Sequence, residues 1–303
     1  MSEAGASEGP ARDAGGGRRP VVTTVEEAVA TIADGAVVGI GGAVTADHPM
    51  ALVRALARRA PRELTVVAPT GGIEVDLLIA AGCVRTVVAS YVGIEGLAAV
   101  GPVFRRAVQE GSVEVVDLDE AHCVQALRAA AQRLPFLPWR GGVGTSFPQL
   151  NRSLVAFDDP VRGEPLLAIP ALELDVALLY AAESDAYGNA QVAGTGHMDA
   201  LLGAAARRVV LQVDRIVTNE RIRQAPERTW FWGETTVARA PFGTHPYSNA
   251  ALTADEQHLR EFARVARAGG DELSDYLDRH VREADHDDYL EQVGIRRLVS
   301  LLV

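Results

Sequence analysis

Short apolar segments and longer Ala-rich segments alternate along the first half of the chain, and turns that contain glycine separate them. The apolar segments have the length of buried strands, and the longer segments have the apolar period of helices. Consecutive parallel strands need a crossover connection, usually a helix, so the alternation predicts a doubly wound, mainly parallel α/β sheet. We expect strands at residues 36–40, 64–68, 85–90 and 113–117, and helices from Thr24, at 49–59 and at 98–110.

The second half continues the same alternation, with one interruption. Residues 151–165 are polar, which indicates a surface loop. Because no linker or internal repeat divides the halves, residues 21–303 are expected to form one α/β domain. Residues 1–20 are rich in Gly, Ala and Glu and are expected to be a disordered tail. Strands are expected at residues 166–169, 176–181, 209–213 and 235–240, and helices at about 198–207, 255–268, 271–283 and 287–293.

Composition excludes several classes of protein. The chain has 303 residues, of which 48% are hydrophobic and 23% charged, as expected of a globular protein with a large core. Its formal net charge of −11 and its lack of a basic run argue against nucleic acid as a partner. No apolar run is long enough to span a bilayer, the N-terminus lacks the apolar core of a secretory signal, and two cysteines are too few for a disulfide framework. We therefore expect a cytoplasmic protein.

The chain contains no lysine, so all of its permanently basic side chains are arginines. A Schiff base needs a lysine, which excludes ordinary pyridoxal-phosphate and class I aldolase chemistry on this chain. A standard P-loop is excluded for the same reason, because its lysine reaches the phosphates.

The segment from residue 117 to 146 holds the strongest candidates for catalysis. Glu120 begins a helical pattern directly after a strand, and ligands in open α/β sheets bind at the carboxyl ends of strands. The apolar sequence PFLP at residues 135–138 forms a hook that leads Arg140 into a glycine-rich loop at residues 141–144. An arginine beside exposed backbone amides favours an anion or oxyanion site. An acid is also typical of a helix start, and Arg140 could equally form a structural ion pair.

A second glycine-rich turn, Gly41-Gly42, follows the strand at residues 36–40. It lacks the third glycine and the acidic residue of a dinucleotide fingerprint. Its backbone N–H groups could point at a thioester carbonyl or a carboxylate, although a plain tight turn has the same sequence. Of the seven histidines, His245 is the best site candidate, with hydrogen bonding to backbone as the structural alternative. No spacing of histidines or cysteines fits a standard zinc site, so no metal is expected.

Five sequence blocks, in order along the chain, point to one protein family. They are GIGGAVTADHPMALVRAL (residues 39–56), LPFLPWRGGVGTS (134–146), AAESDAYGNAQV (181–192), APFGTHPYSN (240–249) and DHDDYLEQVGIRRLVSL (285–301). Together they resemble the α subunits of family I coenzyme A transferases, the glutaconate CoA-transferase group. The resemblance runs from about Val25 to the C-terminus. It implies the CoA-transferase (NagB/RpiA-like) fold, in which two similar subunits pair and place the active site between them.

In the family that the chain resembles, the acyl-CoA thioester is attacked by a glutamate of the other subunit, and that glutamate lies in an E-(S/N)-G motif. This motif is absent here, and Glu183 lies instead in a strand-end turn that resembles the family's A-D-x-x-G-N pattern. The resemblance therefore implies an acyl-CoA substrate, no bound cofactor, and a β-type partner subunit in an αβ or α2β2 complex. Contacts to the oxyanion and carboxylate would come from Gly41, Gly42, Arg140, Gly141, Gly142 and Ser146.

The α subunits of cholesterol ring-cleaving hydrolases, which belong to the same superfamily, are similar at the positions of Glu120 and Arg140. By that resemblance Glu120 would activate water for attack on a ring ketone of a CoA thioester, and Arg140 would hold the oxyanion. The loops at residues 45–48 and 93–99 depart from the hydrolase pattern, so the acyl group stays open between a steroid fragment and another carboxylic acid. A non-catalytic sensor or sugar-phosphate isomerase of related fold ranks last, because such sites generally need a lysine.

Overall fold

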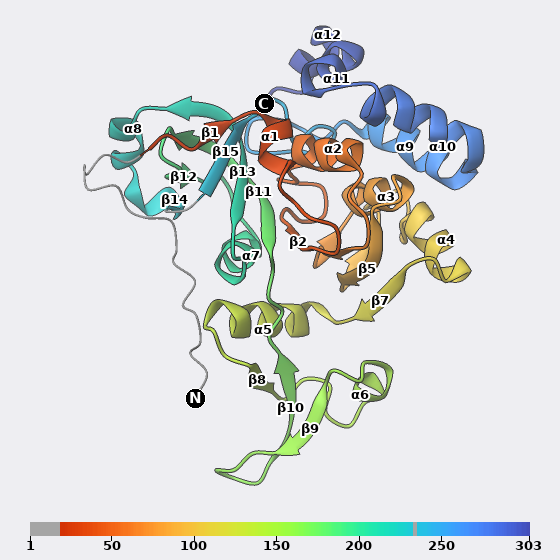
Figure 1. The fold of residues 1–303 in the computed structure, drawn as a ribbon, viewed down its shortest axis with the longest axis vertical. Coiled ribbons are helices and arrows are strands. Elements are labelled where there is room, and N and C mark those ends of the chain that lie inside the picture. The colour runs from red at the N-terminus through yellow and green to blue at the C-terminus, as the bar shows by residue number, and fades with distance from the viewer. Residues whose placement is uncertain (1–18, 233–234) are drawn as a thin grey trace, which may run out of the picture.

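The computed structural model describes residues 19–232 and 235–303, and its centre is a parallel β-sheet (Figure 1). Every hydrogen-bonded pair along the main path of this sheet is parallel, which confirms the prediction. Residues 1–18 of the expected tail lie outside the described residues. The main path runs β1 (Val22–Thr23), β15 (Thr235–Arg239), β13 (Val209–Val217), β11 (Val176–Asp185), β2 (Val37–Ile40), β3 (Leu64–Val67), β5 (Val84–Ala89) and β7 (Glu114–Asp117).

Alternate side chains of the central strands enter two different cores, one on each face of the sheet. In β11, Leu178 lies in one core and Leu179 in the other. Because both faces are covered, the central strands are apolar along most of their length. This is the predicted doubly wound arrangement. One face carries α1 (Val25–Val29), α2 (Met50–Arg59), α3 (Ile73–Ala80), α4 (Pro102–Glu110), α9 (Glu256–Ala268) and α10 (Gly270–Leu277), and the other carries α5 (Glu120–Ala131) and α7 (Asp199–Ala205).

Helix starts follow local rules in the sequence. Thr24 and Glu27 form a capping box at α1, in which the hydroxyl of Thr24 accepts a hydrogen bond from the N–H of Glu27 at 3.1 Å. Asp119 caps α5, because its carboxylate accepts from the N–H of His122 at 2.8 Å. Such caps typically contribute about 0.5–2 kcal/mol. The cap at Asp119 therefore helps to fix where the chain turns from β7 into α5.

A smaller antiparallel sheet, which was not predicted from the sequence, lies between α5 and β11 in the chain. It is below α5 in Figure 1. Residues 135–138, which were expected to form a hook, belong mostly to the end strand β8 (Phe136–Trp139). An end strand tolerates proline, because one of its sides needs no N–H donors. Residues 151–165, which were expected to be a loop, contain β9 (Val155–Asp158), which pairs with β10 (Pro165–Pro170). Asp159, Arg162 and Glu164 belong to the turn between these two strands, whereas the polar residues 151–153 precede β9.

The helices and strands not yet described are short. None of the helices in the described part of the chain is long and apolar enough to cross a membrane. The remaining elements are β4 (Thr70–Gly71), β6 (Tyr91–Val92), α6 (Phe147–Leu150), β12 (Ala190–Gln191), α8 (Asn219–Arg223), a 3₁₀ turn (Pro226–Arg228), β14 (Thr229–Phe231), a π-helical turn (Asp278–Arg282), α11 (His286–Val293) and α12 (Ile295–Ser300).

A buried polar cluster connects the C-terminal helices to α2. The guanidinium of Arg54 lies 3.7 Å from the centre of the Tyr289 ring and donates to the backbone carbonyl of His245 at 3.0 Å. The rings of His258 and His280 lie beside it, with centres 5.4 Å apart. Burial lowers the pKa of both histidines, to about 4 for His280. These rings are therefore neutral near pH 7, which avoids further positive charge beside Arg54.

In acid the protein loses part of its free energy of unfolding, and replacing His280 with glutamine should make this loss smaller. Folding lowers the pKa of His280 from 6.5 to about 4, so the unfolded chain binds the proton first and stability is lost as the pH falls from 6.5 towards 4. Without this group, the loss over that range should be smaller by roughly 1–3 kcal/mol. Urea unfolding at a series of pH values measures the difference. The exposed His197→Gln is the control, and an equal effect of both changes would refute this account.

Candidate active site

The turn that carries Gly41 and Gly42 and the helix start that carries Glu120 leave the same edge of the main sheet. Because the strands are parallel, the turn with Gly41 and Gly42 after β2 and the start of α5 after β7 both lie at the carboxyl edge. Strands β3 and β5 separate β2 from β7, so the two places are about 14 Å apart at ordinary strand spacing. The candidate site thus has a central part at β2 and an outer part at β7.

Gly41 and Gly42 do not offer their N–H groups to a substrate, which corrects the expectation from the sequence. The N–H of Gly41 donates to the carbonyl of Leu178 at 2.9 Å, and that of Gly42 donates to Oδ1 of Asp199 at 2.9 Å. Glycine is needed here for close packing. A Cβ atom at position 41 would lie 2.6 Å from Oδ1 of Asp199, and one at position 42 would lie 2.7 Å from the backbone nitrogen of His48.

The loop after these glycines has an unusual backbone. Val44 and Asp47 have φ angles of 59° and 62°, in the left-handed region that a β-branched residue such as valine rarely adopts. Strain of this kind typically costs about 1–3 kcal/mol and collects at functional sites. Burial raises the pKa of the Asp47 carboxyl to about 6, and its Oδ1 atom has no hydrogen-bond partner among the described residues. An enclosed acid in a strained loop makes this loop a candidate binding element that the sequence did not reveal.

A buried charged cluster lies behind the loop. The Nδ1 atom of His48 is 3.3 Å from Oε2 of Glu74, and both side chains are enclosed. The ring of His48 stacks on Tyr247, with ring centres 4.3 Å apart. Burial alone would lower the pKa of His48, but the carboxylate of Glu74 raises it above its usual value, which favours a charged ring. Burial also raises the pKa of Asp199 to about 7. The sequence does not indicate this cluster, because its members are far apart in the chain.

The outer part of the site is built around the start of α5. Glu120 is exposed, and its carboxylate makes no hydrogen bond or ion pair with the residues that the structure describes. Two residues later, His122 is buried, with its Nδ1 2.7 Å from Oδ1 of Asp119 and its ring stacked on Phe147 at 4.9 Å. A Cβ atom at Gly142 would lie 3.2 Å from Nε2 of His122, so the glycine loop packs on this ring. His122 therefore keeps the glycine loop close to the residue that begins α5.

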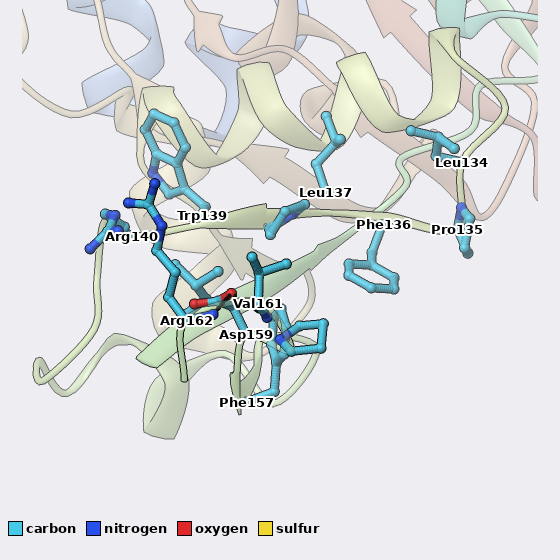
Figure 2. A pocket seen from close by; sticks show the side chains of 13 residues that line it. Leu134, Pro135, Phe136, Leu137, Trp139, Arg140, Phe157, Asp159, Val161 and Arg162 are labelled. Atoms are coloured by element: carbon cyan, nitrogen blue, oxygen red, sulfur yellow. Dashed lines mark hydrogen bonds between the residues drawn. The ribbon is translucent and has the colours of Figure 1, made fainter. Parts of the chain in front are cut away.

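Arg140 follows β8 and forms an ion pair with Glu164. Its guanidinium is largely exposed and borders a groove of about 910 Å³ with mainly apolar walls (Figure 2). The structural ion pair, one of the two roles left open by the sequence, is thus present. Gly141 is half-buried, and Ser146 is exposed at the start of α6. Glu120 does not line this groove, and a joint pocket of Glu120 and Arg140 stays a prediction.

His245 and Glu183 are both buried in the protein. His245 is 2% exposed, with Nδ1 2.7 Å from the hydroxyl of Tyr289 and Nε2 3.1 Å from Asp255. Both ring nitrogens are in use, so His245 serves the polar cluster under the C-terminal helices, contrary to its expected contact with substrate. Glu183 is buried and forms ion pairs with two arginines, which agrees with the expectation that it is not the nucleophile.

Gly42→Ala should destabilise the protein by about 3 kcal/mol or more, because the added methyl group would collide with the backbone of His48. Gly42 also has a φ angle of 90°, which disfavours alanine by itself. Gly35→Ala is the matched control: its φ angle is 74°, but no atom lies within 4 Å of an added Cβ. The control should therefore lose only about 1 kcal/mol. Urea unfolding compares the two, and equal losses would contradict close packing at the exit of β2.

Known proteins share this architecture and sequence. The family model described as coenzyme A transferase matches residues 22–229. The cholesterol ring-cleaving hydrolase IpdA subunit of Mycobacterium tuberculosis is 37% identical over 257 residues, which cover 80% of this chain and 87% of that protein. An uncharacterized protein of Archaeoglobus fulgidus is 34% identical over 89% of this chain, and the chain spans 62% of its length.

The third similarity is to a solved enzyme. One of the subunits of glutaconate CoA-transferase from Acidaminococcus fermentans is 26% identical over 93% of this chain and 94% of that protein. The crystal structure of glutaconate coenzyme A-transferase from the same organism matches with a TM-score of 0.88 and 25% identity, covering 93% of this chain and 96% of that one. The present chain therefore belongs to the coenzyme A transferase family of enzymes, as an α-type subunit.

Proposed function

We propose that the chain is the α-type half of a CoA-transferase, which moves CoA from an acyl-CoA to a carboxylic acid, and that a β-type partner subunit supplies the nucleophilic glutamate. This proposal rests on the burial and ion pairing of two glutamates at the carboxyl edge of the main sheet. Glu74 is enclosed beside His48, and Glu183 forms ion pairs with Arg215 and Arg221 at 3.1 and 3.3 Å. A nucleophile must reach the thioester carbonyl, so neither glutamate can attack it.

Glu120 is accessible, but the surface around it is open to water. A covalent glutamyl intermediate is hydrolysed by water, so the reaction needs a closed site. A second subunit over the carboxyl edge would provide both the closure and the nucleophile. The names of the glutaconate and IpdA relatives, each given as one subunit of an enzyme, support this division of labour. The covalent route predicts ping-pong kinetics.

The chain purified alone should turn over acyl-CoA at least about a hundredfold more slowly than its complex with the partner subunit, because it lacks the nucleophile. Transfer of labelled CoA between two acids measures turnover in both samples. A thermal-shift titration with acyl-CoA shows separately that the isolated chain is folded and binds its substrate. Turnover by the isolated chain at the rate of the complex would exclude this division of roles.

One observation favours a second candidate function. The ring-cleaving hydrolase subunit IpdA shares 37% identity with this chain, and Glu120 is exposed and unpaired within the described structure. As a general base, Glu120 would take a proton from a water molecule that attacks a ring ketone, and Arg140 would stabilise the oxyanion. A guanidinium has five N–H donors, so the ion pair with Glu164 leaves some of them for a ligand. No covalent glutamyl intermediate forms on this route.

Glu120→Gln separates the two functions. The change keeps the shape of the side chain but removes its proton acceptor, so a hydrolase should lose roughly 10²–10⁴-fold in rate. A transferase, in which the partner's glutamate acts, should lose less than about tenfold, or ~1.4 kcal/mol of barrier. Rates are measured in the reconstituted complex, with binding of the CoA thioester measured separately. Glu110→Gln, at the exposed end of α4, is the control, and a nearly unchanged rate for Glu120→Gln rules out the hydrolase mechanism.

A further inference from the structure

The order of the strands creates a crevice at one place along the carboxyl edge of the main sheet. From β2 the chain proceeds through β3 and β5 to β7 in one direction, and from β11 it proceeds through β13 to β15 in the other (Figure 1). Open α/β sheets bind ligands at such a point, where the loops run apart. The last pair of β2 with β11 is Ile40 with Leu178. The last pair of β15 with β13 is Arg239 with Val213, so β11 and β13 both continue past these neighbours.

A cavity of about 350 Å³ lies beside these free ends of β11 and β13. Its walls are mainly apolar and include Ala182 of β11, Phe242, Leu252 and Leu302. Small-molecule sites span roughly 300–1,000 Å³, so this volume suits an acyl chain and not the much larger CoA. The backbone of Phe242 has a φ angle of 56°, which a bulky residue rarely adopts. Strain of this kind collects at ligand sites, which supports a role for the cavity in binding.

Asp214 brings a carboxyl group to this cavity. Its Oδ2 atom accepts hydrogen bonds from the hydroxyl of Tyr180 at 2.6 Å and from the side-chain amide of Asn249 at 3.4 Å. Its Oδ1 atom is buried and has no partner in hydrogen-bond geometry among the described residues. A buried acceptor without a partner is unfavourable, so a ligand that donates a hydrogen bond would stabilise it. The χ2 torsion of an aspartate is soft, so a small rotation presents Oδ1 to the cavity.

A second carboxyl group adds negative charge beside the cavity. The N–H of Asp47 donates to the carbonyl of Ser248 at 2.9 Å, which joins the strained loop after β2 to the segment that forms one wall. Burial raises the pKa of Asp47 to about 6, and the charge of Asp214 adds to this rise. Burial likewise raises the pKa of Asp214 to about 6, so both groups are mainly ionised above pH 7. Arg215 also lines the cavity, but it is paired with Glu183 and compensates Asp214 only in part.

We propose that this cavity binds the end of the acyl chain that is remote from the thioester, and that Asp214 selects acyl groups whose remote end carries a hydroxyl or an ammonium group. Either group would donate a hydrogen bond to Oδ1 of Asp214, while the apolar walls cover the rest of the chain. An ionised carboxyl group only accepts hydrogen bonds, so a carboxylate at the same end of the ligand is repelled. The thioester itself rests on the proposed function, whereas the choice of end group follows from the cavity.

Thioethers of CoA test the cavity without any reaction, because they have no carbonyl carbon to attack. Four ligands with the same chain length end in a methyl, a hydroxyl, an ammonium or a carboxylate group: S-hexyl-CoA, S-(6-hydroxyhexyl)-CoA, S-(6-aminohexyl)-CoA and S-(5-carboxypentyl)-CoA. Calorimetric titration of the complex with the partner subunit, above pH 7, measures each Kd. A ligand with a donor should bind at least about tenfold more tightly than S-hexyl-CoA, and the carboxylate ligand at least about tenfold more weakly. A preference for only one of the two donors identifies the end group.

Two variants of the complex locate the ligand in the cavity. Asp214→Asn keeps the shape of the side chain but removes its charge, so the preference for the donor ligands over the carboxylate ligand should fall at least about tenfold. Asp287→Asn, exposed in the first turn of α11, is the matched control and should keep the wild-type preference. Ala182→Val adds two methyl groups to a wall of the cavity. It should weaken all four thioethers at least about threefold and leave the Kd of free CoA unchanged.

Similar Kd values for all four thioethers in the wild-type complex would overturn the proposal. So would tightest binding of the carboxylate ligand, or an Asp214→Asn complex that keeps the wild-type preference. If Asp214→Asn does not fold, the Ala182→Val complex still decides: unchanged binding of the thioethers would place the acyl chain outside this cavity. The proposed function fails in a different way, since a complex that binds neither free CoA nor any thioether would have no CoA site at all.

Discussion

The buried charged cluster at the exit of β2 determines how the layers of this molecule meet. His48 comes from the loop after β2, Glu74 from α3, Asp199 from α7 and Tyr247 from the loop before α9. Helices α3 and α7 lie on opposite faces of the sheet, so the cluster connects both cores at the carboxyl edge. Removing one partner of a buried ion pair leaves the other uncompensated, at a cost of about 3–5 kcal/mol. The geometry of the candidate site therefore depends on charge as well as on apolar packing.

Two sets of buried groups couple folding to proton binding in opposite directions. Burial raises the pKa of Asp47 and Asp214 to about 6, and that of Asp76 and Asp199 to about 7. A carboxyl with a raised pKa stabilises the folded state most in acid, and this contribution is lost as the pH rises from 4 towards 7. The histidines under the C-terminal helices have lowered pKa values, so their effect has the opposite sign. The two contributions offset each other between about pH 4 and 7, which flattens the net dependence of stability on pH.

Local rules in the sequence predicted the main sheet and the helix start at Thr24, because a helix start depends on residues only three positions away. The small sheet was missed because β8 contains a proline and β9 is only four residues long, so neither has the pattern of a strand. The position of Glu120 in the first turn of α5 was predicted for the same local reason. The roles of Gly42 and His245 were not, because their partners approach from distant segments. Contacts of that kind depend on tertiary packing, which a single sequence does not display.

The small sheet is part of one excursion from the main sheet. The chain leaves at the end of β7, forms α5 and the strands of the small sheet, and returns to the middle of the main sheet as β11 (Figure 1). Glu120, Arg140 and all three strands of the small sheet belong to this excursion. The strand pairs of the main sheet all lie outside this excursion. A change within this single stretch of the chain can therefore reshape the surface that carries Glu120 and Arg140 without altering the strand order of the scaffold.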